Sequence, residues 1–379
     1  MRVSQIVLHK RQPEPSDLSA LAVLKPQLVL AFGSVEALQG AGDVLAQVFS
    51  DAHRLGCSTA GEISSSGVTD GSLVVTAVAL DTSRVVQCTT VLASMDDSHA
   101  AGRRLVADLP PEGLRAILVL GQGVQINGSA MLAGMTEVVG TAVPITGGLA
   151  GDGGAFARTW VLDDKGISSD RLVCVGLYGE AFTVLHGSFG GWSPFGPARK
   201  VTRCENNVLM ELDGEPALSV YKRYLGEHAK GLPASGLLFP FAMLGSDHNE
   251  LGLIRTILGV DEATGSLTLA GDIEPDGYLK LMHSNTDALV DGAEAAARAA
   301  RDMQTLPDAG LALLVSCVGR KLVMGGRVDE EVEAVGEVFG QGATLAGFYS
   351  YGEISPFVNA TECKLHNQTM TITYLAETA

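Results

Sequence analysis

Aromatic side chains are scarce in this chain. Phe, Trp and Tyr together make up 5% of the 379 residues, with only two Trp. The hydrophobic core must therefore be built mainly from Val, Leu and Ala. Charged residues are also few, at 18% against 46% apolar residues, and this balance excludes an intrinsically disordered chain. At roughly 150 residues per domain, the length predicts two or three domains' worth of chain.

Basic residues are in deficit. The 26 Lys and Arg against 43 Asp and Glu give a net charge of −17 at pH 7, and no local cluster of Lys or Arg offsets it. This argues against nucleic acids and anionic membrane surfaces as main partners. No apolar run approaches the roughly 20 residues that a membrane span needs, and Met1–Lys10 lacks the layout of a secretory signal. We therefore expect a cytoplasmic protein without nucleic-acid or membrane partners.

The cysteines form no C-x-x-C pair and are spread along the chain. They are Cys57, Cys88, Cys174, Cys204, Cys317 and Cys363. Four of the six lie in apolar, strand-like surroundings, which predicts reduced and buried thiols. Zinc is not expected, because no two candidate ligands have the spacing of a metal site.

Glycine is abundant, at 46 residues, or roughly 12% of the chain against a usual ~7%. Many glycines belong to a pattern that occurs three times, over residues 28–80, 116–178 and 311–375. Each copy predicts a buried strand, a helix, a turn of small residues and another strand. Short apolar strands of this kind are typical of sheets covered by helices. We expect an α/β fold in which repeated βαββ-like units form helix-covered sheets, arranged in two modules.

The small-residue turns of the three copies align without a gap at residues 58–62, 148–152 and 349–353. Each places a carboxylate directly after a glycine, as Glu62, Asp152 and Glu353. One interpretation is a repeated tight turn whose acid is solvated or caps a backbone amide. The other is that related turns converge on a shared cavity, in which small side chains leave room for a ligand and the acids anchor it.

Residues 180–307 interrupt the repeat. They begin with a glycine-rich stretch that contains Trp192, and they include predicted helices over 215–226 and 287–301 and a predicted strand over 254–260. We place the boundary between the modules in the first of these helices. The expected divisions are an N-terminal segment 1–20, a first module 21–220 and a second module 221–379.

Several stretches in this order resemble the FIST sensory family. They include GCSTAGEI at 56–63, GGLAGD at 147–152, Phe239-Pro240 and LHNQTMT at 365–371, within a resemblance that runs from about Leu28 to Tyr374. It implies an N-type and a C-type FIST module in an intracellular small-ligand sensor of bacterial signal transduction. Amino acids have been proposed as ligands of the family. The two modules leave no room for an attached output domain, so we expect a separate signalling partner such as a histidine kinase or a cyclic-dinucleotide enzyme.

The candidate ligand-binding residues combine the small-residue turns with scarce aromatic and polar side chains near glycines. Tyr349 and Tyr351 lie in the third turn, and the LHNQTM run supplies polar groups that must find partners if they are buried. The full set is Ser58, Thr59, Glu62, Gly148, Asp152, Trp192, Tyr349, Tyr351, Glu353, His366 and Asn367.

Haem is the alternative cofactor, because the resemblance includes haem-binding members that sense nitric oxide. An axial ligand would come from His186, His248, His283 or His366, and spacing does not separate them. No C-x-x-C-H attachment site exists, so such a haem would be non-covalent. No other cofactor is expected.

A small-metabolite enzyme that uses Cys57 as a nucleophile is the second alternative. A reactive thiolate needs a neighbouring base or cation, and residues 56–71 contain no Lys or Arg. The common hydrolase, zinc-protease and phosphate-loop motifs are also absent. We therefore expect a protein that is not an enzyme.

Overall fold

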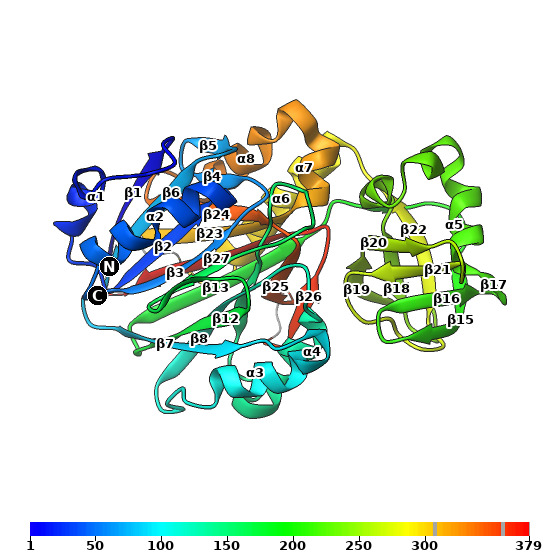
Figure 1. Cartoon of the computed structure of the whole chain (residues 1–379), viewed down its shortest axis with the longest axis horizontal. Coiled ribbons are helices and arrows are strands. Elements are labelled where there is room, and N and C mark those ends of the chain that lie inside the picture. The colour runs from blue at the N-terminus through cyan, green and yellow to red at the C-terminus, as the bar shows by residue number, and fades with distance from the viewer. Residues whose placement is uncertain (306–308, 358–360, 379) are drawn as a thin grey trace.

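The computed structural model describes residues 1–305, 309–357 and 361–378. A large body of sheets and helices lies beside a smaller β-rich domain (Figure 1). The body contains the residues before 190 and after 285, and the small domain contains most of those between. The two ends of the chain lie close together, since the N-terminal amine forms ion pairs with Asp81 and Glu377.

Three units of similar element order build the body. The first consists of β1 (Arg2–Leu8), α1 (Pro15–Ala22), β2 (Leu28–Gly33), α2 (Val35–Val48), β3 (His53–Ser58), β4 (Glu62–Ser64), β5 (Gly67–Thr69) and β6 (Leu73–Ala79). The second consists of β7 (Arg84–Val91), the short helix η1 (Met95–Asp97), α3 (Ser98–Val106), β8 (Leu114–Gly121), α4 (Gly128–Val139), β9 (Ile145–Leu149), β10 (Val161–Asp163), β11 (Gly166–Ser168) and β12 (Arg171–Tyr178).

The third unit is split by the small domain. It begins with β13 (Phe182–Phe189) and resumes with α6 (Thr286–Arg301), β23 (Gly310–Cys317), α7 (Val318–Met324), η4 (Gly325–Arg327), α8 (Asp329–Phe339), β24 (Ala343–Ser350), β25 (Gly352–Pro356), β26 (Cys363–His366) and β27 (Met370–Glu377). In the first unit, the helix that the repeat predicts is α2. It begins at Val35, and its N-cap Ser34 accepts a hydrogen bond from the Ala37 amide at 3.3 Å.

Strand pairing is the same in all three units. In the first, β2 runs parallel to β3 and antiparallel to β6, which also pairs with β1. The same partners and directions recur in the second unit, among β7, β8, β9 and β12. They recur again in the third unit, among β13, β23, β24 and β27. This shared order is what the threefold sequence pattern predicts. The N-terminal residues expected to form a separate segment instead supply β1 and α1 of the first unit.

The short hairpins of the units are exchanged in a cycle. The hairpin β4–β5 extends the sheet of the third unit, β10–β11 that of the first, and β25–β26 that of the second. Three six-stranded sheets result, and they enclose one shared core that includes Phe32, Leu118 and Phe348. Helices α1 and α2, α3 and α4, and α6 and α8 cover the outer faces of the three sheets.

Equivalent glycines allow the parallel strands to approach closely. A Cβ on Gly56, Gly147 or Gly347 would lie 2.1, 1.9 or 1.8 Å from a carbonyl oxygen of the neighbouring strand. No side chain fits at that distance, so the glycine content of these runs has a structural cause in the sheet itself.

The small domain forms a nine-stranded sheet assembly with its own core. Its elements are β14 (Ser193–Pro194), β15 (Arg199–Glu205), β16 (Val208–Leu212), β17 (Glu215–Pro216), α5 (Ala217–Leu225), η2 (Gly226–Gly231), η3 (Ala234–Leu238), β18 (Phe241–Leu244), β19 (Glu250–Arg255), β20 (Ile257–Asp261), β21 (Ser266–Leu269) and β22 (Tyr278–His283). The single strand expected over 254–260 is divided between β19 and β20. A boundary between residues 220 and 221 falls inside α5, whose flanking strands β15, β16 and β21 share one sheet.

Candidate functional site

The three small-residue turns meet in the middle of the body. Backbone hydrogen bonds join each turn to the other two: Gly151 N to Ser58 O at 2.9 Å, Tyr349 N to Gly61 O at 2.8 Å, and Tyr351 N to Leu149 O at 3.1 Å. The turns therefore converge, but their own backbone fills the space where they meet. Gly151 illustrates this, because a Cβ there would lie 2.7 Å from the backbone nitrogen of Ala60 in the first turn. A Cβ on Gly148 would lie 2.7 Å from a methyl group of Val315 in β23.

Glu62 and Glu353 are bound within their own units in the same way. The carboxylate of Glu62 accepts hydrogen bonds from the Thr59 hydroxyl and from the amide and hydroxyl of Ser72. Glu353 accepts them from the Ser350 hydroxyl and from the amide and hydroxyl of Thr369. Burial raises the pKa of Glu62, and it raises the pKa of Glu353 to about 8, although the hydrogen bonds oppose the shift in both.

Asp152 is bound differently from the other two acids. It accepts a hydrogen bond from the hydroxyl of Tyr351 and three more from the backbone amides of residues 156–158, at 2.8 to 2.9 Å. Burial alone would raise its pKa, but these hydrogen bonds outweigh burial and the pKa is lowered. The ring of Tyr351 stacks on Phe156 with 4.1 Å between centroids.

The remaining turn residues and Trp192 have protein partners. The hydroxyl of Ser58 donates to the Gly151 carbonyl at 2.6 Å. The hydroxyl of Tyr349 donates to buried Glu331 at 2.5 Å, and the Trp192 Nε1 donates to the Gln368 carbonyl at 2.7 Å. These contacts give all three residues a structural role.

The four candidate haem ligands are dispersed. His366 is buried, its Nε2 donates to the Ser355 carbonyl at 2.9 Å, and burial lowers its pKa to about 4. His186 is buried in β13, its Nδ1 has no partner within the described ranges, and burial lowers its pKa. His248 stacks on Tyr278 and His283 packs edge-on against Phe195, both on the small domain.

The other polar groups singled out in the sequence are buried as well. Asn367 donates to the His366 carbonyl at 2.9 Å, while its Oδ1 has no partner among the described residues. Cys57 is fully buried in the shared core, and burial raises the pKa of its thiol. Within the described ranges, no cluster of His, Cys, Asp and Glu has the geometry of a metal site.

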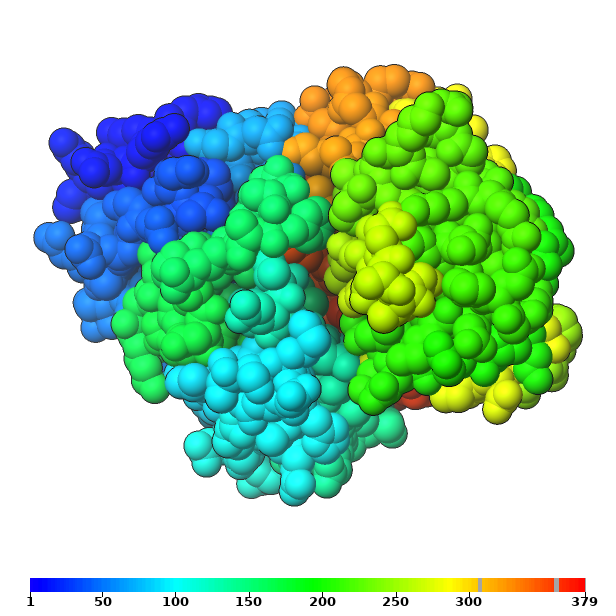
Figure 2. Space-filling model, turned by 45° about the vertical axis from the view of Figure 1, so that its right-hand side comes forward, coloured from blue at the N-terminus to red at the C-terminus, as the bar shows by residue number. Residues whose placement is uncertain are grey.

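A cleft between the body and the small domain holds two cavities, of about 590 and 280 Å³. Figure 2 shows this cleft between the cyan part of the body and the green and yellow small domain, with the red C-terminal region visible at its floor. Leu365 of β26 lines both cavities. Tyr351 and Phe156 line the smaller one, opposite Leu258 and Leu269 of the small domain. No histidine is among the lining residues of either cavity, so neither fits a histidine-ligated haem.

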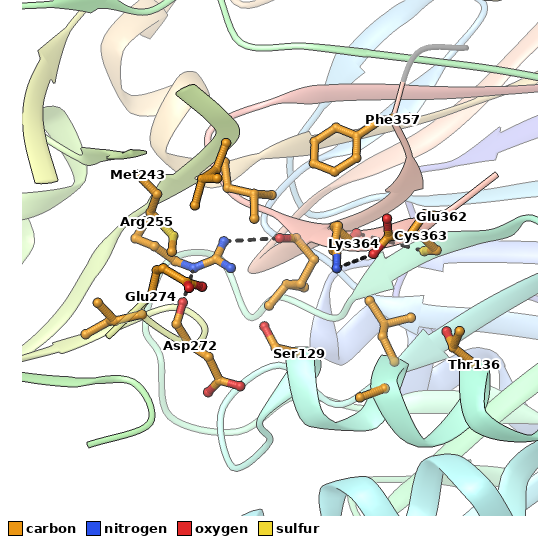
Figure 3. Close-up of a pocket in the computed structure, with 16 residues that line it drawn as sticks. Ser129, Thr136, Met243, Arg255, Asp272, Glu274, Phe357, Glu362, Cys363 and Lys364 are labelled. Atoms are coloured by element: carbon orange, nitrogen blue, oxygen red, sulfur yellow. Dashed lines mark hydrogen bonds and ion pairs between the residues drawn. The ribbon is translucent and has the colours of Figure 1, made fainter. Parts of the chain in front are cut away.

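Arg255 lines the larger cavity (Figure 3) and is its buried charged residue. The residue ends β19 and is only 4% exposed. Its Nε donates to the Asp272 carbonyl at 2.9 Å, and its Nη1 donates to the carbonyls of Ile254 and Leu365 at 3.1 Å. In the described part of the chain its guanidinium forms no ion pair, and Nη2 has no hydrogen-bond partner. Burial lowers its pKa to about 10, which leaves it charged at neutral pH.

Ser129 approaches Arg255 from the body side of the cleft. It is the second residue of α4, which is capped by Asn127 through a hydrogen bond to the Ala130 amide at 3.0 Å. The Ser129 Oγ is buried without a partner among the described residues. A Cβ on Gly271 would lie 3.1 Å from both this Oγ and the guanidinium carbon of Arg255, so the two groups flank Gly271.

Acidic side chains line the same cavity. Asp272 is half-buried and accepts a hydrogen bond from the Asn127 side chain at 3.0 Å, while Glu274 is exposed. Across the described ranges neither forms an ion pair, whereas Lys364 pairs with Glu362 at 2.5 Å. Among the residues that the structure describes, the cavity therefore offers one buried cation and two acids that form no ion pair.

Sequence reasoning missed Arg255, Ser129, Asp272 and Glu274. One signal was present: Arg255, followed by Thr256, interrupts an apolar run, with Leu253-Ile254 before it and Ile257-Leu258 after it. A charged residue inside such a run needs a partner.

Two family models match consecutive parts of the chain. The FIST N domain covers residues 27–215 and the FIST C domain covers residues 217–356. FIST domains are sensory, ligand-binding domains of signal transduction. A search of the described residues finds no helix with the length and apolar character of a membrane span.

Individual relatives are more distant. An uncharacterized protein of Methanocaldococcus jannaschii is 33% identical over 89 residues, which is 23% of this chain and 17% of that protein. This chain thus matches under a fifth of that relative's length. A crystal structure of a cyanuric acid hydrolase from A. caulinodans aligns over 100% of this chain and 99% of its own, at 9% identity and a TM-score of 0.38. A second cyanuric acid hydrolase structure has the same coverage and identity and a TM-score of 0.34.

The likeness to these hydrolases is too weak to carry an inference, whereas the two family models cover most of the chain in the order that the sequence predicts. The chain belongs to the FIST family, with an N-type domain followed by a C-type domain.

Proposed function

We propose that this protein senses a small, amino-acid-like metabolite, which binds in the cleft between the body and the small domain, and that it signals through a separate partner protein. The single observation behind the proposal is the buried, unpaired guanidinium of Arg255 in the larger cavity. Membership of a sensory family supports the same conclusion independently.

A buried cation without an ion-pair partner among the described residues is costly, and the carbonyl dipoles and the nearby charge of Asp272 compensate only part of that cost. A ligand carboxylate would supply the missing charge through short, charge-assisted hydrogen bonds. The Ser129 hydroxyl, which is buried and unpartnered beside Gly271, is placed to donate to the same anion. The N-terminus of α4 adds a favourable dipole at this point.

The acidic side chains of the cavity could bind the ammonium group of an amino acid. Asp272 and Glu274 have no ion-pair partner among the described residues, and both line the cavity that holds Arg255. An ammonium group next to the carboxylate would be balanced by these acids, and Asp272 remains fixed by its hydrogen bond from Asn127. The cavity therefore matches a zwitterion better than a simple anion.

A ligand in this position would contact both sides of the cleft, Ser129 and Leu365 on the body and Arg255 on the small domain. Binding would therefore favour one arrangement of the small domain over others, because a ligand stabilises the state that it contacts best. A partner protein such as a histidine kinase or a cyclic-dinucleotide enzyme would detect that arrangement.

Calorimetric titration with each proteinogenic L-amino acid tests the proposal. We expect saturable binding of at least one, and a loss of about 2–5 kcal/mol in Arg255→Met, part of which reflects the carboxylate left unpaired. The matched control is Arg203→Met, because Arg203 is an exposed arginine of the same domain, paired with Glu211 at the surface. Wild-type affinity in a folded Arg255→Met variant, or no binding of any amino acid, would contradict the proposal.

A further inference from the structure

Two cysteines lie directly opposite each other in the sheet of the second unit. Cys88 of β7 is the register partner of Cys174 of β12. Both side chains lie on the face covered by α3 and α4, since they belong to the same hydrophobic cluster. The Cys174 Sγ lies 3.7 Å from the Leu105 carbonyl of α3.

The register brings the two backbones to a distance that a disulfide can span. The Leu92 amide donates to the Asp170 carbonyl at 2.7 Å, which makes residues 92 and 170 a hydrogen-bonded pair. Such pairs recur every second residue of an antiparallel ladder, and the register has no shift between there and Cys88. The Cα atoms of a hydrogen-bonded pair are about 5.5 Å apart, within the roughly 4.4–6.8 Å range of disulfides.

The two thiols differ in access. β7 is the edge strand of its sheet and Cys88 is half-buried, whereas Cys174 is fully buried on the neighbouring strand. A hydrogen bond from Cys174 lowers the pKa of Cys88, which favours the thiolate on the accessible sulfur. The accessible thiol is thus the better nucleophile, and the buried one is placed to react with it afterwards.

The other cysteines lack such a partner. Their register partners are Phe32 and Val161 for Cys57, Leu209 for Cys204, Ser350 for Cys317 and Pro356 for Cys363. The Cys88–Cys174 pair is therefore distinct among the six free thiols.

We propose that Cys88 and Cys174 form a site of reversible oxidation by hydrogen peroxide, separate from the cleft. The Cys88 thiolate attacks one peroxide oxygen and becomes a sulfenic acid, and the other oxygen leaves as water after taking up a proton. The Cys174 sulfur then attacks the Cys88 sulfur, which forms the disulfide and releases the sulfenic oxygen as a second water. The two thiols lose two electrons in total, and hydrogen peroxide accepts them.

Hydrogen peroxide added to the full-length folded protein tests the proposal. After alkylation of the remaining thiols and proteolysis, mass spectrometry should find the Cys88 and Cys174 peptides joined, and dithiothreitol should separate them. The titre of free thiols should fall by two. This measurement on the wild-type chain does not depend on whether any variant folds.

Variants separate the two steps. Cys174→Ser should leave a sulfenic acid on Cys88 that dimedone traps, and Cys88→Ser should keep all its remaining thiols at the same peroxide dose. Cys204→Ser is the control, because Cys204 is also half-buried but opposes Leu209, and it should still form the disulfide. Over-oxidation of Cys88 with Cys174 still open to alkylation, or a disulfide between other cysteines, would overturn the proposal.

Discussion

Replacing Glu353 by Gln should change how stability depends on pH. Burial raises the pKa of Glu353 from 4.5 to about 8, so the folded state keeps this proton over a range in which the unfolded chain has lost it. Stability from this group is fully present below pH 4.5 and is lost as pH rises through 8. At about 1.4 kcal/mol per unit, the 3.5 units between these values correspond to a loss of about 5 kcal/mol.

Gln can occupy the site without a new unpaired group. Its Oε1 can accept from the amide and hydroxyl of Thr369, and its Nε2 can donate to the hydroxyl of Ser350, which is free to rotate. The variant should therefore match the wild type near pH 5 and exceed it by several kcal/mol at pH 9.

Urea unfolding of both proteins at pH 5, 6, 7, 8 and 9, followed by tryptophan fluorescence, measures the difference. Glu62→Gln is the matched comparison, since Glu62 has an equivalent set of hydroxyl and amide donors and burial also raises its pKa. Stability curves for wild type and Glu353→Gln that run parallel across this range would refute the reasoning.

Three further outcomes are expected. Burial lowers the pKa of His366 from 6.5 to about 4, so its contribution is present above pH 6.5 and lost as pH falls to 4; His366→Gln should remove about 3 kcal/mol of this acid sensitivity in urea unfolding. Gly347→Ala should destabilise the body by about 1–3 kcal/mol or more, because the new Cβ would lie 1.8 Å from the Leu314 carbonyl oxygen. Gly326→Ala is the control: a Cβ there would meet no described atom within 4 Å, so the melting temperature should hardly change. Tyr351→Phe removes the hydroxyl that donates to Asp152 and accepts from the Gly154 amide at 3.0 Å; amide hydrogen exchange of residues 152–158 should become faster, and unchanged protection would contradict the anchoring role.

The sequence predicted the repeating part of the fold because its signals are local. Each unit carries apolar strands, a helix and a small-residue turn in one order, and the structure has this order in all three units. Helix punctuation was equally informative at residues 215–226, where Pro216 precedes and Gly226 follows α5. Family membership also followed from short stretches in the right order.

The candidate site depends on contacts that the sequence pattern does not encode. Glu62 and Glu353 align with Asp152 in the repeat, and each accepts a hydrogen bond from the hydroxyl three positions earlier, on Thr59 or Ser350. Leu149 stands at that position before Asp152, which is instead bound by Tyr351 and by the amides of residues 156–158. An alignment of turns shows that they are related, whereas the donors available in three dimensions decide what each acid does.

By itself, the sequence determined the repeating unit, with its order of strands and helices and its glycines at close strand contacts. It also determined that the chain belongs to the FIST family. Only the tertiary structure decided how the units combine. The hairpins are exchanged in a cycle, and the small domain is inserted after β13. Arg255 is buried opposite Ser129 across the cleft, although the two residues are 126 positions apart in the sequence. Periodicity and turn chemistry act over a few residues, but hairpin pairing and the burial of a charge depend on which distant surfaces meet.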